Sequence, residues 1–80
     1  MTREEIDRVV RETVGLVLGR PIPPGVEFSR RVEPVWDSLK HIEVMFAVED
    51  ACGVRFAEED LAELDSVAAL VSAVERRRGS

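Results

Sequence analysis

A serine near the middle of the chain has neighbours suited to a modified or reactive hydroxyl. The tripeptide Asp37-Ser38-Leu39 follows a long proline-rich stretch and opens an apolar, acidic segment. Aspartate is a favoured N-cap residue, so Ser38 is expected on the first turn of a helix, where an attached phosphate is stabilised. His41 lies three residues on, but no third residue is evident to orient it and there is no Gly-x-Ser-x-Gly turn. The pattern favours an acceptor site for a modification over a hydrolytic nucleophile; the alternative is that Asp37 and Ser38 only cap the helix.

Four segments around this tripeptide favour helices, and in the longer ones apolar residues recur at steps of three and four. The first has capping-box spacing at Thr2 and Glu5 and is followed by Gly19, a typical residue after a helix end. The second lies between Asp37 and Gly53, and a short acidic segment and a final segment follow. The predicted helices span about residues 2–18, 38–52, 57–64 and 66–77.

A long loop is predicted between the first and second helices, because residues 19–36 contain four prolines and two glycines. The expected fold class is all-α: a small four-helix bundle forming one domain over residues 1–80, with three longer helices and one short helix. Met45 and Phe46 are expected in the core or lining a pocket. Four apolar residues are expected to hold the loop to the core: Ile22, Val26, Phe28 and Val35.

The composition excludes several classes of protein. The chain has 80 residues, with 11 Lys and Arg, 16 Asp and Glu, one His and one Cys. So small a domain can spare little surface for a deep substrate pocket, and its single cysteine, Cys52, cannot form an internal disulfide and is expected to be buried. The net charge of −5 argues against nucleic-acid binding, and no apolar run is long enough to span a membrane. The charged start, residues 1–5, is unlike a signal peptide, so we expect a cytoplasmic protein. We also expect a monomer.

The negative charge is concentrated in the middle third of the chain. Residues 37–66 contain nine acidic and two basic residues, a net charge of −7. This segment is either a solvated acidic face or a docking surface for basic partners. The arginines of residues 76–78 are expected to be solvated at a helix C-terminus, where the helix dipole favours cations.

Together these features resemble the acyl carrier proteins, the helical domains that carry a 4′-phosphopantetheine arm. Asp37-Ser38-Leu39 matches the attachment motif of that family, and residues 42–50 resemble the apolar, acidic helix that follows it. The resemblance covers essentially the whole chain. It extends to the loop with Phe28, the linker ending at Phe56, the acidic segment 57–64, and Ser66-Val67 at the start of the last helix.

The resemblance implies a carrier without catalytic activity of its own. Ser38 would be esterified to 4′-phosphopantetheine, which a phosphopantetheinyl transferase takes from coenzyme A, and the arm would hold acyl groups as thioesters. The implied partners are enzymes of fatty acid, polyketide or other specialised biosynthesis with basic docking patches: acyl- or adenylate-forming ligases, acyltransferases and ketosynthases. Leu39 would be an exposed apolar contact and Ile42 a residue near the acyl pocket. The implied docking residues are Asp37, Leu39, Ile42, Glu43, Glu49 and Asp50, with Asp37 and Leu39 also flanking the arm.

The chain departs from the family pattern at several residues, and three of these are candidates for pathway-specific contacts: Trp36, Lys40 and His41. Trp36 either anchors the loop on the core or contacts a partner. His41 is expected to be an exposed helix residue, with a minor role near the phosphate as the alternative. These departures favour a specialised pathway over bulk fatty acid synthesis. Two other functions stay open: a carrier of an amino acid or hydroxy acid loaded by an adenylating ligase, and a helical interaction module without an arm.

Overall fold

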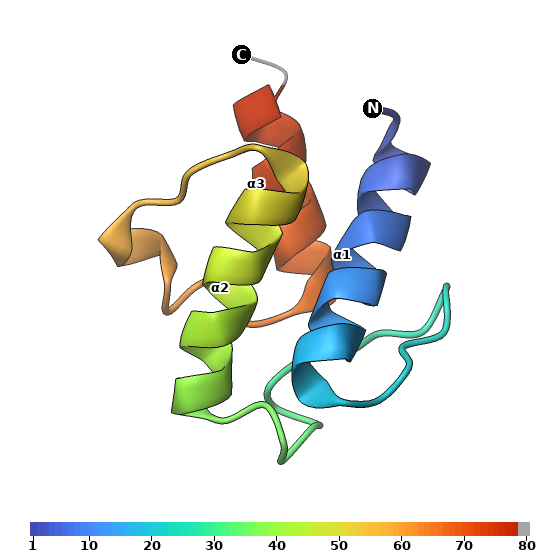
Figure 1. Cartoon of the computed structure of the whole chain (residues 1–80), viewed down its shortest axis with the longest axis vertical. Coiled ribbons are helices and arrows are strands. Elements are labelled where there is room, and N and C mark those ends of the chain that lie inside the picture. Colours follow the sequence, from blue (N-terminus) through green and yellow to red (C-terminus); the bar gives the residue numbers. More distant parts are fainter. Residues whose placement is uncertain (79–80) are drawn as a thin grey trace.

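Helices make up most of the chain in the computed structural model, which describes residues 1–78. The elements are α1 (Arg3–Leu18), α2 (Ser38–Cys52), the short 3₁₀ helix η1 (Glu58–Asp60) and α3 (Val67–Arg78). α1 runs antiparallel to α2 and α3 and packs against both (Figure 1). The described residues contain no β-strand, so the all-α prediction is confirmed for this part of the chain. The radius of gyration, 11.3 Å, is close to the roughly 12 Å expected of a compact domain of this length.

α1 begins with the capping box that the sequence predicts. The Thr2 hydroxyl accepts a hydrogen bond from the Glu5 N–H (3.2 Å), and the Glu5 carboxylate accepts one from the Thr2 N–H (2.9 Å). The hydrogen bond from the Thr2 backbone lowers the pKa of Glu5, because it favours the ionised carboxylate. The helix ends at Gly19, whose φ of 74° suits glycine. The face turned to the core consists of Ile6, Val10, Val14, Gly15 and Leu18.

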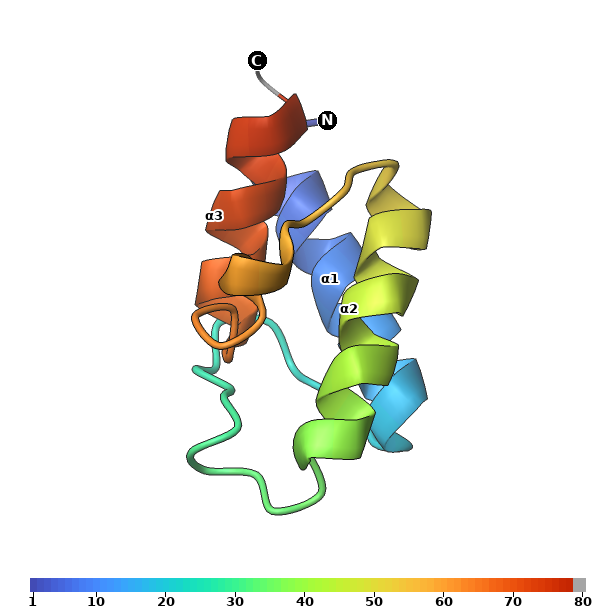
Figure 2. The same cartoon turned by 90° about the vertical axis from the view of Figure 1, so that its left-hand side faces the viewer.

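The loop between α1 and α2 folds under the ends of the helices (Figures 1 and 2). Its buried apolar residues are Ile22, Phe28 and Trp36, whereas Val26 and Val35 are exposed. The prediction that these two valines anchor the loop is therefore wrong. Polar contacts replace them, because Arg11 Nη1 donates to the carbonyl oxygens of Pro23 (2.8 Å) and Val26 (2.7 Å).

Backbone hydrogen bonds tie the same loop to the start of α3. The Val67 N–H donates to the Phe28 carbonyl (2.9 Å), and the Arg30 N–H donates to the Asp65 carbonyl (2.9 Å). These bonds surround an isolated antiparallel bridge between Ser29 and Ser66. The loop is thus held at its centre as well as at its ends.

α2 spans Ser38–Cys52, the predicted range, but its apolar residues do not all face the core. Val44, Met45, Val48 and Cys52 are buried, and burial raises the pKa of the Cys52 thiol. Phe46 is 66% exposed, so its prediction as a core residue is wrong. The reason is helical phase: successive residues are about 100° apart, so a helix that buries residues 44, 45 and 48 turns residue 46 outward.

The α-helix predicted over residues 57–64 is reduced to η1 and the turn after it. The Asp60 carboxylate accepts from the Ala57 N–H (3.0 Å), and the Leu61 carbonyl is directed to His41 (2.6 Å) instead of continuing a helix. A short segment rich in acidic residues is also a weak helix, because like charges at helical spacing repel and few hydrogen bonds offset nucleation.

The C-terminal arginines of α3 are exposed, as predicted for a solvated helix end, and two of them also contact other elements. Arg78 Nη1 donates to the Cys52 carbonyl at the end of α2 (2.8 Å). Arg77 pairs with Asp60 (2.5 Å), and its guanidinium lies over the Phe56 ring, 5.6 Å from the ring centre. These contacts bind the end of α3 to α2 and to η1.

Candidate functional site

Ser38 is the first residue of α2, at the end of the bundle where the long loop arrives (Figure 2). Its side chain is exposed, as are its neighbours Asp37 and Leu39. Asp37 caps the helix: its Oδ1 accepts from the Lys40 N–H (2.9 Å), and its carbonyl accepts from the His41 N–H (2.8 Å). The cap fixes the backbone on both sides of Ser38 and leaves its hydroxyl pointing away from the core.

A buried contact between Trp36 and His41 holds this helix start from below. Trp36 is 2% exposed and His41 is 4% exposed, so the prediction of an exposed His41 is wrong. The indole Nε1–H donates to His41 Nδ1 (3.0 Å), and His41 Nε2 lies 2.6 Å from the Leu61 carbonyl oxygen. An indole N–H only donates and a carbonyl only accepts, so the imidazole is neutral with its proton on Nε2.

This geometry removes His41 from any chemistry at Ser38. Both ring nitrogens are occupied by Trp36 and Leu61, so neither can accept the serine proton or reach a phosphate. Trp36 packs against Phe28, with ring centres 6.0 Å apart, and belongs to the core, as the loop-anchor interpretation predicts. The third departure from the family pattern, Lys40, lies on the surface beside Glu43, with Nζ and Oε2 3.5 Å apart.

Arg30 reaches Ser38 from the loop, a contact that the sequence did not indicate. Its Nη2 lies 3.3 Å from Ser38 Oγ, and its Nε lies 3.3 Å from the Trp36 carbonyl oxygen. Eight residues separate Arg30 from Ser38, and only the path of the loop brings them together. Arg31, the next residue, has the same side chain and is exposed, so the sequence holds no signal that distinguishes the two.

Exposed apolar side chains continue along α2 from Ser38. Leu39, Ile42 and Phe46 are exposed by 68%, 48% and 66%, and their spacing places them on one face of the helix. Exposed Val35 lies just before the helix. We call Leu39, Ile42 and Phe46 the apolar stripe of α2. Large apolar residues exposed in a contiguous row are typical of an interaction surface.

The predicted acidic docking residues are in different environments. Glu43 and Asp50 are exposed, whereas Glu49 is half-buried and its Oε2 accepts from the Phe56 N–H (2.7 Å). Glu49 therefore has a structural role in holding the segment after α2. Exposed Glu43 lies beside the apolar stripe, on the turn that also contains Ile42.

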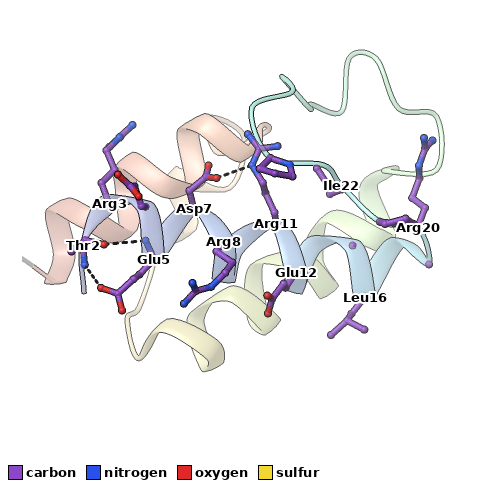
Figure 3. A pocket seen from close by; sticks show the side chains of 15 residues that line it. Thr2, Arg3, Glu5, Asp7, Arg8, Arg11, Glu12, Leu16, Arg20 and Ile22 are labelled. Carbon is purple, nitrogen blue, oxygen red and sulfur yellow. Dashed lines mark hydrogen bonds and ion pairs between the residues drawn. The ribbon is translucent and has the colours of Figure 1, made fainter.

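An open groove lies elsewhere, along the outer face of α1 (Figure 3). It is bordered by charged side chains of that helix, among them Arg8 and Glu12, by the exposed Leu16, and by Ile22 at the start of the loop. None of the predicted site residues lines it. Ser38 is thus exposed at the end of the bundle and does not line this groove.

Two further features, a metal site and a membrane-spanning helix, can be assessed for the residues that the structure describes. Within residues 1–78, no three His, Cys, Asp or Glu side chains are grouped so that they could hold a metal ion. No helix in this part of the chain has the length and apolar character needed to cross a membrane.

Comparisons of the chain with protein-family models, curated proteins and solved structures found no match.

Proposed function

We propose that this protein is an acyl carrier protein of the four-helix type, with a 4′-phosphopantetheine arm on Ser38. One observation carries the proposal: the Ser38 hydroxyl is exposed on the first turn of α2, beside a guanidinium and an apolar surface, and its nearest histidine is fully engaged elsewhere. A hydroxyl without a base suits a modification site and not a hydrolytic nucleophile.

The residues present fit the attachment reaction. Ser38 Oγ attacks the phosphorus of coenzyme A that bears the pantetheine ester. The bond from this phosphorus to the bridging pyrophosphate oxygen breaks, adenosine 3′,5′-bisphosphate leaves with the bonding electrons, and the serine proton passes to a base that the transferase supplies. Arg30 and the N-terminus of α2 lie where the phosphodiester charge arrives.

The attached arm supplies a terminal thiol that holds the acyl group as a thioester. The protein's task is then delivery, since a tether raises the local concentration of its cargo at each partner's active site. An exposed attachment point leaves such an arm free to enter partner active sites. This agrees with the position of Ser38 at the end of the bundle.

The surface around Ser38 suits short-lived docking to basic enzymes. The apolar stripe supplies contact area, while Asp37, Glu43 and Asp50 supply exposed negative charge. Charge pairs at an exposed rim mainly raise the association rate and weaken with salt. A phosphopantetheinyl transferase, an acyl- or adenylate-forming ligase, an acyltransferase or a ketosynthase would be the partners, with the cargo an acyl, aminoacyl or hydroxyacyl group.

The apolar stripe also supports a second candidate, a helical interaction module that carries no arm. Exposed apolar residues spaced along one helix face are the kind of surface on which a partner helix docks without any modification. This candidate requires Ser38 to stay unmodified in the cell of origin.

Intact-mass measurement tests the proposal. The protein is incubated with coenzyme A, Mg²⁺ and a transferase of broad specificity, and we expect a gain of one phosphopantetheine group. Ser38→Ala should gain nothing, and Ser72→Ala, at a half-buried serine of α3, should gain as much as the wild type. A wild-type protein that stays unmodified would overturn the proposal and favour the interaction module.

A thiol assay gives an independent readout. Burial raises the pKa of the Cys52 thiol, so this group is both inaccessible and protonated near neutral pH. We expect a disulfide reagent to react rapidly with one thiol in the modified protein and with none in the unmodified folded protein.

A further inference from the structure

Arg30 places a cation at a helix end that ordinarily disfavours one. Its guanidinium contacts Ser38 Oγ at the N-terminus of α2, where the helix dipole contributes partial positive charge. The Asp37 carboxylate at the same end offsets one positive charge, and its Oδ1 is directed to the Lys40 N–H. The immediate surroundings of Ser38 Oγ are therefore rich in hydrogen-bond donors.

The fold holds Arg30 in this position without an acidic partner. Its backbone N–H donates to the Asp65 carbonyl (2.9 Å), and its Nε donates to the Trp36 carbonyl (3.3 Å). Among the residues described, Arg20 pairs with Glu33 and Arg77 with Asp60, but no carboxylate lies within 4.0 Å of the Arg30 guanidinium. A guanidinium has five N–H donors, so contacts with two neutral oxygens leave capacity for an anion.

We propose that Arg30 binds the phosphodiester of the group attached to Ser38 and positions the root of the arm. This inference rests on the proposed function. The unesterified oxygens of a phosphate on Ser38 lie two bonds from Oγ, which the guanidinium already contacts, so it reaches them with little movement. Arginine binds phosphate with two parallel N–H donors, a stronger and more directional contact than a lysine makes.

The backbone adds donors to the same place. In residues 1–78 the N–H groups of Ser38 and Leu39 have no hydrogen-bond partner, whereas those of Lys40 and His41 are satisfied by Asp37. Arg30 and the two free N–H groups would hold the phosphodiester, and the pantetheine beyond it would stay mobile. The first bonds of the arm would then leave the protein in one direction.

The test compares unmodified and modified protein for three chains: wild type, Arg30→Ala and Arg31→Ala. Arg31→Ala is the matched control, because Arg31 is the next residue and is exposed, and its substitution removes the same charge. A contact made only in the folded, modified protein raises the folding equilibrium constant on modification. We expect a rise of about three- to tenfold in wild type and Arg31→Ala, and less than about twofold in Arg30→Ala, measured by urea unfolding.

Nuclear magnetic resonance of the wild type gives a second measurement that requires no variant. We expect the Arg30 Nη–H resonances, which belong to the group that contacts Ser38, to move downfield on modification and their exchange with water to slow, while those of Arg31 stay unchanged. Attachment of the arm with no change at Arg30, or equal responses of the two variants, would overturn this inference and leave the proposed function intact. If mass measurement finds no arm on the wild type, both proposals fall.

Discussion

The dipeptide Asp-Ser stands at two helix starts in this chain, and the structure uses the two serines differently. At α2, Asp37 is the cap and Ser38 is the first helical residue, with an exposed side chain. At α3, the capping contact moves one residue on: Ser66 Oγ accepts from the Ala69 N–H (3.1 Å), and Ser66 is half-buried. The hydroxyl of a serine that caps a helix accepts a hydrogen bond from the backbone, whereas the hydroxyl of a serine after the cap is left to other groups, here Arg30.

The loop between α1 and α2 causes this shift. It forms a bridge between Ser29 and Ser66, and its Phe28 carbonyl accepts from the Val67 N–H. The backbone at Ser66 is therefore held extended and cannot enter the helix. At Asp37 the loop makes no such bridge, and the helix begins directly after the aspartate. Similar local sequences thus acquire different roles from contacts with distant residues.

The largest expected effect is on stability and comes from substituting Trp36, which is buried beneath the start of α2. Trp36→Ala removes a fully buried indole and should lower the free energy of unfolding by about 3–5 kcal/mol, as measured by urea unfolding with circular dichroism. Trp36→Phe keeps most of the apolar volume but leaves His41 Nδ1 buried without a donor, at a cost of about 1–3 kcal/mol. Val35→Ala, at an exposed neighbour, is the control. If Trp36→Ala cost no more than Val35→Ala, the indole would not be the support of this helix start.

Substitutions of the two serines should differ in their effect on the stability of the protein, because the two hydroxyls differ in their contacts. Ser66→Ala removes the cap of α3 and should cost about 1 kcal/mol, whereas Ser38→Ala should change stability by less than about 0.5 kcal/mol. Thermal and urea unfolding of the two variants measure the difference. Ser66→Ala should still be modified on Ser38. Equal losses for the two alanine variants would contradict the distinction between capping and free serine.

Asp37 combines a cap with an exposed charge, and two substitutions separate these roles. Asp37→Ala should cost about 1 kcal/mol of stability, and Asp37→Asn should cost less because asparagine also caps. Both should raise the KM of the transferase by about two- to fivefold at low salt, an effect that shrinks as salt is added. An unchanged KM for Asp37→Asn would limit Asp37 to capping.

The smallest expected effect is at the start of α1, which the Thr2–Glu5 capping box stabilises. Folding lowers the pKa of Glu5, so its ionised form stabilises the folded state above its unfolded pKa, and that stabilisation is lost as the pH falls through the folded pKa. The difference in melting temperature between wild type and Glu5→Gln should be largest near neutral pH and shrink on acidification to about pH 3. A constant difference at Glu5 would contradict a role for its charge.

The helix limits were largely predictable because their signals are local. Thr2, Gly19, Asp37 and Gly53 are capping residues whose backbone conformations depend on their own type and a few neighbours. The prediction of an α-helix over residues 57–64 was wrong because a distant side chain, His41, contacts the Leu61 carbonyl oxygen. Phe46 was misplaced because an apolar residue on a mostly apolar helix carries no sign of which phase the bundle selects.

The sequence by itself determined the three longer helices, their caps, the acidic middle third and the presence of Asp37-Ser38-Leu39 at a helix start, since these follow from residue type and short-range spacing. Only the tertiary structure decided which serine hydroxyl caps a helix, that His41 is buried against Trp36, and that Arg30 lies beside Ser38. Each of these depends on where the proline-rich loop runs. A loop without repeating hydrogen bonds takes its path from contacts far along the chain, which no local pattern encodes.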